Sequence, residues 1–112
     1  MNFSESVSEG FPVVCMNGRI DSSTAKTCED YLLSHVADGR PALVLDLAKV
    51  DYVSSAGLRV LVMASQRAMG LGRGFAVCNL QEDVAEVMEI SGLEEVLNVC
   101  EDLGAAISVV KA

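Results

Sequence analysis

The sequence predicts an α/β fold with a mostly parallel central sheet, an antiparallel strand at its N-terminal end and helices packed around the sheet. Two observations lead to this prediction. After two strand-like segments at the start, short apolar runs alternate with stretches of helical periodicity. Glycine-containing turns separate many of these segments. Alternation of this kind requires crossover connections, which make neighbouring strands parallel.

The first predicted elements form a hairpin and a helix. Residues 3–9 alternate weakly between apolar and polar side chains, and residues 11–16 form a more apolar strand after a turn at Gly10. Residues 17–24 are rich in turn and capping residues. Apolar residues then recur at helical spacing at Ala25, Cys28, Leu32, Leu33 and Val36. The first helix should therefore extend to about Ala37 and stop at Asp38 and Gly39.

The middle of the chain predicts an interior strand followed by a second helix. Residues 42–47 are an apolar run typical of a buried strand, and residues 48–52 form the connection that follows it. A helix is predicted from about Ser55 to Ala68, before a glycine cluster at residues 70–74. Its expected apolar face comprises Leu58, Leu61, Val62, Ser65 and Met69.

The last third continues the alternation. We expect a strand at residues 75–80, a helix at 82–91, a short strand at 96–99 and a closing helix at 101–110. The first of these helices should bury Val84, Val87 and Met88. The closing helix should bury Leu103, Ala106, Ile107 and Val110.

Length and composition restrict the function. The 112 residues suit a single domain with one core, and 51% hydrophobic residues exclude intrinsic disorder. No apolar stretch reaches the roughly 18 residues that span a bilayer, and the first residues lack a secretory signal pattern, so we expect a cytoplasmic protein. The net charge of −8 disfavours binding to nucleic acid or to an anionic membrane, because both require clustered Lys and Arg.

The cysteines and the acidic residues are read as structural features. The four cysteines, at positions 15, 28, 78 and 100, are too scattered for a metal site and lie mostly in apolar, strand-like surroundings. We therefore expect small core residues, and no metal or cofactor. The segment 82–102 carries eight acidic residues and no Lys or Arg. A solvated surface is the favoured interpretation, and a surface for a basic partner is the alternative.

The serine pair at residues 54 and 55 lies where a strand connection ends and the second helix begins. A helix starting there directs free backbone N–H groups and a positive dipole end toward the serines, which favours an anion such as phosphate. Ser is also a common helix cap, so simple capping is the alternative. Only one serine can be the cap, however, and the small Ala56 and Gly57 leave room for a partner surface.

Two other classes of protein, a serine hydrolase and a phosphoaspartate receiver module, fit the sequence less well. Ser55, Ala56 and Gly57 match the end of a Gly-x-Ser-x-Gly hydrolase motif, but Val53 replaces its first glycine, and His35 is the only histidine that could act as a base. A phosphoaspartate receiver module would place its acceptor at Asp46 or Asp51. Such a module also needs a lysine after its last strand, and the sequence has none between residues 50 and 110.

Three segments together resemble the STAS domain family, and in particular the stand-alone bacterial anti-sigma-factor antagonists. They are Gly18–Asp21 before the first helix, Leu43–Leu47 followed by Val50–Leu58, and Gly92–Leu97. The resemblance covers nearly the full length, and the block that ends in Gly57-Leu58 is its most diagnostic part. It implies a single STAS domain over residues 1–112.

The resemblance also implies a function without catalysis. In this family a Ser or Thr just before the Gly-Leu pair is phosphorylated by a partner that is both anti-sigma factor and serine protein kinase. A PP2C-type phosphatase removes the phosphate, and the unphosphorylated form binds the partner and frees its client. Alignment on Gly57-Leu58 makes Ser55 the acceptor and puts Ser54 where many members carry Asp, so Ser54 is the runner-up. A STAS scaffold that is not switched by phosphorylation is the alternative.

The expected partner surface surrounds the serine pair and continues along the exposed side of the second helix. We expect a monomer when the protein is free. The residues of this surface are Asp21, Ser22, Ser23, Ser54, Ser55, Ala56, Gly57, Arg59, Met63, Gln66 and Arg67.

Overall fold

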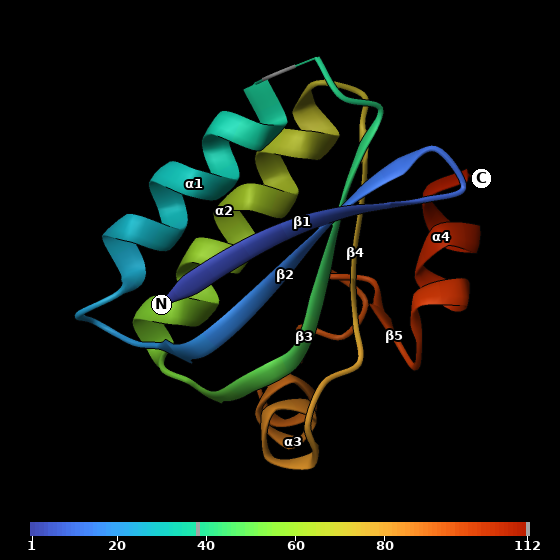
Figure 1. Ribbon diagram of the computed structural model, residues 1–112. Helices are drawn as coiled ribbons and strands as arrows, with labels where there is room; N and C mark the ends of the chain where they lie inside the picture. The colour runs from blue at the N-terminus through green and yellow to red at the C-terminus, as the bar shows by residue number, and fades with distance from the viewer. Residues whose placement is uncertain (38, 112) are drawn as a thin grey trace.

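The computed structural model describes residues 1–37 and 39–111. Within them, five strands form one sheet in the order β1-β2-β3-β4-β5 (Figure 1). The strands are β1 (Asn2–Ser8), β2 (Phe11–Ile20), β3 (Ala42–Val53), β4 (Gly74–Cys78) and β5 (Val99–Cys100). The helices are α1 (Ala25–Ala37), α2 (Ser55–Gly70), α3 (Glu82–Ile90) and α4 (Leu103–Lys111). β1 is antiparallel to β2 and all other neighbours are parallel, which confirms the predicted fold class.

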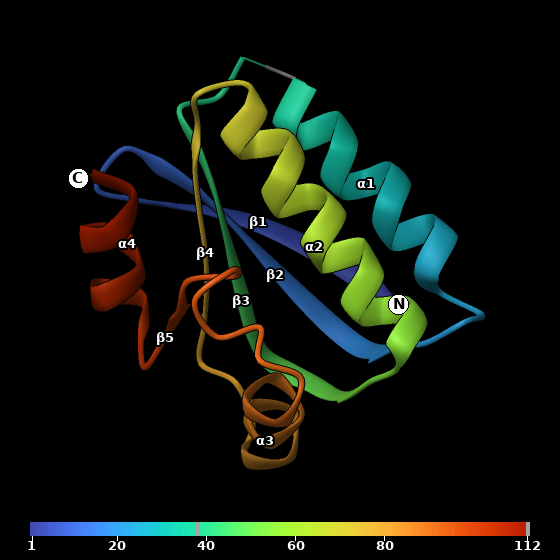
Figure 2. The same cartoon turned by 180° about the vertical axis from the view of Figure 1, so that it is seen from behind.

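Helices pack on both faces of the sheet. α1 and α2 lie side by side on one face, α4 packs on the opposite face near β4, and α3 lies at the end of the sheet (Figures 1 and 2). Strand alternation divides the apolar residues between two cores. Val14 and Leu45 belong to the larger core under α1 and α2, whereas their neighbours Val13 and Val44 belong to the smaller core under α4.

The strands β2 and β3 are longer than the sequence predicted. β2 continues from residue 16 to Ile20, and β3 continues through the expected connection at 48–52 to Val53. Ile20, Val50 and Val53 are all buried, so the strand extensions contribute side chains to the core. Register shifts between Cys15 and Asn17, and again beyond Gly18, break the alternating pattern that would have revealed the extensions.

The buried face of α2 also differs from the prediction. Leu61 and Ser65 are buried as expected, and Leu58 and Val62 are half-buried, but the side chain of Met69 is 65% exposed. The face against the sheet consists largely of small residues, which allow a close approach but carry a weak hydrophobic signal. Its members are Gly57, Val60, Leu61, Ala64, Ser65 and Ala68.

The C-terminal elements shift by a few residues. The expected strand at 96–99 is wrong over most of its length, because the chain turns there and only Val99–Cys100 pairs with β4. The Leu97 N–H donates to the Leu93 carbonyl at 2.9 Å, and the side-chain amide of Asn98 donates to the Phe75 carbonyl at 2.8 Å. α4 begins at Leu103 rather than 101 and buries Ala106 and Ile107 as predicted. The predicted end of α1 at Asp38 lies outside the described residues.

The cysteines are free thiols. Cys28 and Cys78 are buried as predicted, whereas Cys15 and Cys100 are half-buried. Burial raises the pKa of Cys78 to about 12, so this thiol stays protonated. Among the described residues, no group of three or more His, Cys, Asp or Glu side chains is arranged to hold a metal ion. In the same part of the chain, no helix has the length and apolar character to cross a membrane.

Candidate functional site

Ser54 caps the N-terminus of α2. Its backbone is extended, with φ −86° and ψ 176°, and its Oγ accepts a hydrogen bond from the Gly57 N–H at 3.2 Å. Its carbonyl accepts from the Leu58 N–H at 2.8 Å. The Ser54 N–H donates to the Ile20 carbonyl, also at 2.8 Å, which joins the start of α2 to the end of β2. The side chain of Ser54 therefore has a structural role.

Ser55 is the first residue of α2, and its side chain is exposed. Within the described residues, its hydroxyl makes no hydrogen bond. The N–H groups of Ser55 and Ala56 are in the first turn and have no acceptor among residues 1–37 and 39–111. The junction thus presents one free hydroxyl next to two free backbone donors and the positive end of a helix dipole.

Gly57 brings the helix start unusually close to β2. A Cβ at this position would lie 2.4 Å from the Ile20 carbonyl oxygen and 2.8 Å from the Ile20 Cγ2 atom. Only glycine fits such an approach without displacing backbone. The close packing fixes the serine junction beside the loop that follows β2, which contains Asp21, Ser22 and Ser23.

The loop after β2 is held by its own hydrogen bonds. The Asp21 carboxylate accepts from the Ser23 N–H at 2.9 Å and from the Ser23 hydroxyl at 2.7 Å. These bonds, with a smaller contribution from Arg19, lower the pKa of Asp21, which stays ionised. The Thr24 hydroxyl accepts from the Asp21 N–H and donates to the Arg19 carbonyl. Ser22 and Ser23 are exposed on this ordered loop.

Sequence reasoning missed a pair of residues at the ends of β2 and β3. The guanidinium of Arg19 lies 4.3 Å from the centre of the Tyr52 ring, and its Nε atom lies 3.5 Å from the Asp21 carboxylate. Arg19 on β2 and Tyr52 on β3 are partners in the register of the two strands, and Tyr52 is 43% exposed. The pair was missed because both residues were read as parts of connections rather than of neighbouring strands.

The predicted stripe along α2 is largely exposed. Arg59, Gln66 and Arg67 are exposed, whereas Met63 is half-buried. These side chains continue from the serine junction along the helix by roughly 3.6 residues per turn. The structure therefore brings the serine junction, the Asp21 loop and the start of the α2 stripe to one end of the molecule.

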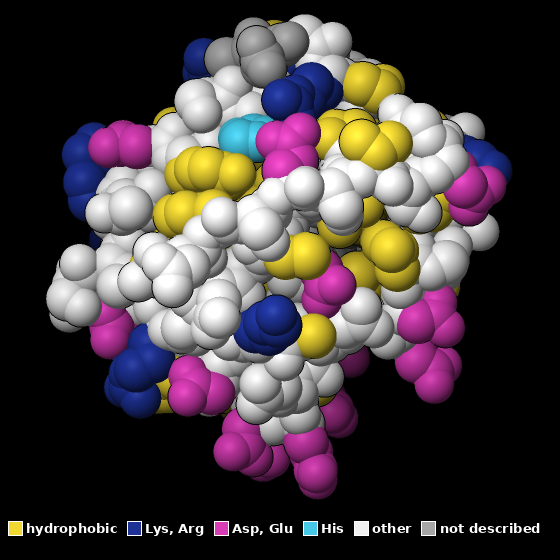
Figure 3. Space-filling view, viewed as in Figure 1, with side chains coloured by type: hydrophobic (Ala, Val, Ile, Leu, Met, Phe, Trp, Pro, Cys, Tyr) yellow, Lys and Arg dark blue, Asp and Glu magenta, His cyan; other side chains and the backbone are white. Residues whose placement is uncertain are grey.

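The acidic segment forms a separate surface. All eight of its carboxylates are exposed, and acidic side chains gather over α3 at the lower end of the molecule (Figure 3). Four of them line a shallow hollow of about 520 Å³ with Ala85 and Ile90. These four are Glu82, Glu86, Glu89 and Glu94.

Two groups that the competing classes would use, His35 and Asp46, have partners within the described residues. His35 lies in the last turn of α1, where its Nε2 atom is 2.9 Å from a Glu5 carboxylate oxygen. The loop beside Ser55 precedes the other end of α1, so His35 does not approach Ser55 (Figure 1). Asp46 is half-buried and accepts hydrogen bonds from the Cys15 thiol and the Ala48 N–H. The described residues form a small α/β domain with an exposed serine hydroxyl at a helix start.

Comparison with known proteins identifies the family. The STAS domain family model matches residues 3–106, and the chain belongs to this family. Over 92% of its length the chain is 34% identical to a Bordetella bronchiseptica protein named "Putative anti-sigma factor antagonist BtrV", and the match covers 89% of BtrV. The anti-sigma-F factor antagonist RsfB of Mycobacterium tuberculosis is 29% identical, over 91% of this chain and 83% of RsfB.

A solved structure agrees with these sequence matches. The crystal structure of an anti-sigma factor antagonist from Mycobacterium paratuberculosis superimposes with a TM-score of 0.88 at 29% identity. The superposition covers 99% of this chain and 94% of that one. The expected STAS fold is therefore confirmed.

Proposed function

We propose that this protein is an anti-sigma-factor antagonist that works by partner switching. The unphosphorylated form binds an anti-sigma factor that is also a serine protein kinase, and this binding releases the client of that factor. Phosphorylation of Ser55 abolishes the complex, and a PP2C-type phosphatase restores it. One observation carries the proposal: Ser55, the first residue of α2, offers an exposed hydroxyl that bonds to no other described residue. The names of BtrV and RsfB support the antagonist function.

The contrast between the two serines supports Ser55 as the acceptor. The Ser54 hydroxyl accepts a hydrogen bond from the Gly57 N–H, and the Ser54 N–H donates one to the Ile20 carbonyl. Transfer of a phosphate to Ser54 would break the cap, whereas transfer to Ser55 disturbs no hydrogen bond between described residues. A kinase can therefore modify Ser55 without unfolding the helix start.

The phosphate is compatible with the fold and incompatible with the complex. It adds about −1.5 to −2 charges beside the free N–H groups of Ser55 and Ala56, where the helix dipole favours an anion. Buried in an interface without a pairing group, the same charge costs about 2–5 kcal/mol, or roughly thirtyfold to several thousandfold in affinity. This magnitude is sufficient for a binding switch.

The proposed docking surface combines the serine junction, the Asp21 loop and the α2 stripe. The protein supplies no catalytic group, because the ATP, the Mg²⁺ and the transfer machinery belong to the kinase. The proposal places the protein in the cytoplasm as a free monomer, with no nucleic acid or membrane as a partner. The docking residues are Asp21, Ser22, Ser23, Ser54, Ser55, Ala56, Arg59, Met63, Gln66 and Arg67. Gly57, which the sequence placed on this surface, is buried against β2 and supports the surface from beneath.

The test is intact-mass analysis after incubation with the cognate anti-sigma kinase, ATP and Mg²⁺. The wild-type protein and Ser54→Ala should each gain one phosphate, and Ser55→Ala should gain none. A phosphate that is lost only in Ser54→Ala would move the acceptor by one residue. Binding of the kinase without any added phosphate on the wild type would favour the unswitched scaffold instead.

A further inference from the structure

The outer face of β1, β2 and β3, opposite α1 and α2, carries a polar patch that partner switching does not use. The patch lies within the sheet rather than at its end, and strand register arranges its side chains across the three strands. Six residues form two rows, Asn2–Asn17–Lys49 and Ser4–Cys15–Asp46.

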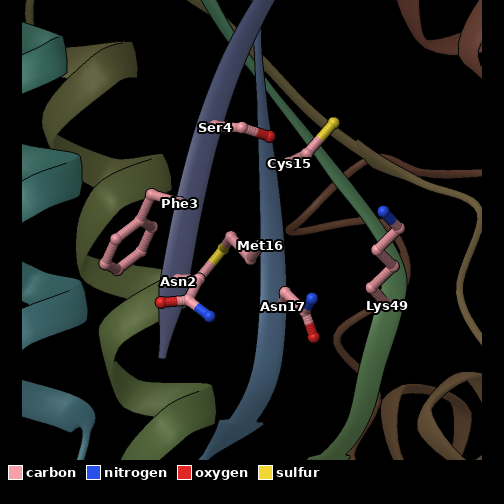
Figure 4. A pocket seen from close by; sticks show the side chains of 7 residues that line it. All are labelled: Asn2, Phe3, Ser4, Cys15, Met16, Asn17 and Lys49. Atoms are coloured by element: carbon pink, nitrogen blue, oxygen red, sulfur yellow. The ribbon is translucent and has the colours of Figure 1, made fainter.

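Two adjoining hollows open on this patch. Their volumes are about 200 Å³ and 90 Å³, and both are lined by Ser4, Cys15, Met16 and Lys49. Ser4, Cys15, Asn17 and Lys49 lie along one side of the strands, whereas Phe3 points away toward the helices (Figure 4). Sites for drug-sized ligands usually measure roughly 300–1,000 Å³, so these hollows suit a smaller molecule.

A bulge in β3 creates the patch. Between the pairs Cys15–Asp46 and Asn17–Lys49, β3 contains one residue more than β2. The Ala48 N–H there donates to the Asp46 carboxylate at 3.0 Å, and the Ala48 carbonyl accepts from the Gln81 amide at 2.9 Å. Bulges redirect side chains and are common beside functional sites. Lys49 lines both hollows, and Asp46 lines the smaller one, so the bulge brings the two charged residues to one hollow.

The patch offers unused polar groups of both charges. Within the described residues, the Lys49 ammonium makes no ion pair and no hydrogen bond. The Asp46 carboxylate accepts only from the Cys15 thiol at 3.8 Å and from the Ala48 N–H, so lone pairs remain available. The two charges both line the smaller hollow without bridging each other, and Lys49 also lines the larger one with Asn17. The side-chain amides of Asn2 and Asn17 also have no protein partner in this part of the chain.

The charges favour one ligand class. A simple anion would be attracted by Lys49, but it would meet the Asp46 carboxylate and a net charge of −8. A simple cation would be attracted by Asp46 but repelled by the Lys49 ammonium. A zwitterion has no net charge and satisfies both groups. We propose that the two hollows bind a small zwitterion of the amino-acid class, with its carboxylate on Lys49 and Asn17 and its ammonium on Asp46. This binding does not depend on the phosphorylation state of Ser55.

A titration of the ¹⁵N-labelled protein followed by NMR tests the proposal. Each proteinogenic amino acid is added separately. Acetate, methylammonium and inorganic phosphate serve as single-charge probes, which carry charge of one sign only. At least one amino acid should shift the amide resonances of residues 2–4, 15–17 and 46–49 in a saturable way. The single-charge probes should shift the same resonances less at equal concentration.

Three variants assign the binding to the two charges. Lys49→Met and Asp46→Asn should each weaken amino-acid binding by about tenfold or more, because each removes a charge-assisted hydrogen bond. Lys26→Met is the matched control, since Lys26 is an exposed lysine on α1 that pairs with Asp30, and it should bind like the wild type. The ¹⁵N spectra of the variants report whether each has kept its fold.

Three results would overturn the proposal. The first is no saturable shift in these segments with any amino acid. The second is a response to acetate or phosphate that equals the response to amino acids and is unchanged in Asp46→Asn, which would make the patch a plain anion site. The third is equal weakening of binding by Lys26→Met, which would place the effect in the overall charge rather than in the hollows.

Discussion

At the scale of single residues, capping chemistry alone does not distinguish the two serines. Both are small hydroxyl residues before an apolar helix, and either could cap it. The structure gives the cap to Ser54, through its bond to the Gly57 N–H, and leaves Ser55 exposed. The sequence could predict the pair and its resemblance to an acceptor site. The cap geometry follows from the junction with Ile20, which only the folded chain shows.

The two serines should therefore differ in their effect on stability. Ser54→Ala should lower the free energy of unfolding by about 1 kcal/mol, because it removes the cap. Ser55→Ala should change it by less than about 0.5 kcal/mol, because its side chain is exposed and unbonded. Urea denaturation of both variants measures the difference. A larger loss in Ser55→Ala would mean that the assignment of the cap is wrong.

Gly57 permits a second test with a control in the same helix. Gly57→Ala should destabilise the protein by about 2 kcal/mol or more, since its Cβ would collide with the Ile20 carbonyl and must push α2 away from β2. At Gly70 a Cβ would meet nothing within 4 Å. Gly70→Ala should be neutral or stabilising by up to about 1 kcal/mol. Similar melting temperatures for the two variants would contradict the close packing at Gly57.

At the scale of elements, the helices were easier to predict than the strand ends. α1 and α3 were predicted to within a residue or so, because their apolar residues repeat at helical spacing. The ends of β2 and β3 were hidden by bulges and by the turn-like residue types of segment 17–20. Consequently the Arg19–Tyr52 contact and the polar rows around Lys49, which depend on register, could not be predicted.

Contacts between β1 and α1 make the stability of the first strand depend on pH. Glu5 on β1 pairs with His35 and Arg40, and Phe3 stacks on Tyr31 with ring centres 4.0 Å apart. The hydrogen bond with His35 and then that with Arg40 lower the pKa of Glu5. A carboxyl whose pKa is lower in the folded state stabilises the fold above its unfolded value of 4.5, and this stabilisation is lost as the pH falls further.

The variant Glu5→Gln tests this link. It should be less stable than the wild type at neutral pH. The difference should shrink as the pH falls below about 4.5, because the carboxyl of the unfolded wild type is protonated there, and it should be lost below the lowered pKa of the folded state. Urea denaturation across that pH range is the measurement. The control is Glu95→Gln, an exposed residue for which no ion pair occurs among the described residues. A constant difference at all pH values would point to packing rather than charge.

At the scale of the whole molecule, modification should change binding without changing the fold. Phosphorylated protein should keep the ¹⁵N spectrum of the unmodified form except around residues 54–58 and the Asp21 loop, because the helix start tolerates the charge. Affinity for the kinase should fall at least thirtyfold, as measured by calorimetry. Widespread spectral changes would show that the phosphate acts by rearranging the fold.

The close contact between Gly57 and Ile20 has a consequence for how such proteins diversify. It fixes Ser55, the proposed phosphoacceptor, through buried backbone, whereas the neighbouring Arg59, Gln66 and Arg67 are exposed and can change at little cost in stability. Duplicated copies of the gene can therefore exchange these exposed side chains while the proposed switch stays intact. Pathways that run in parallel in one cell can in this way become independent of each other. Each antagonist keeps the same proposed chemistry and acquires a different partner specificity.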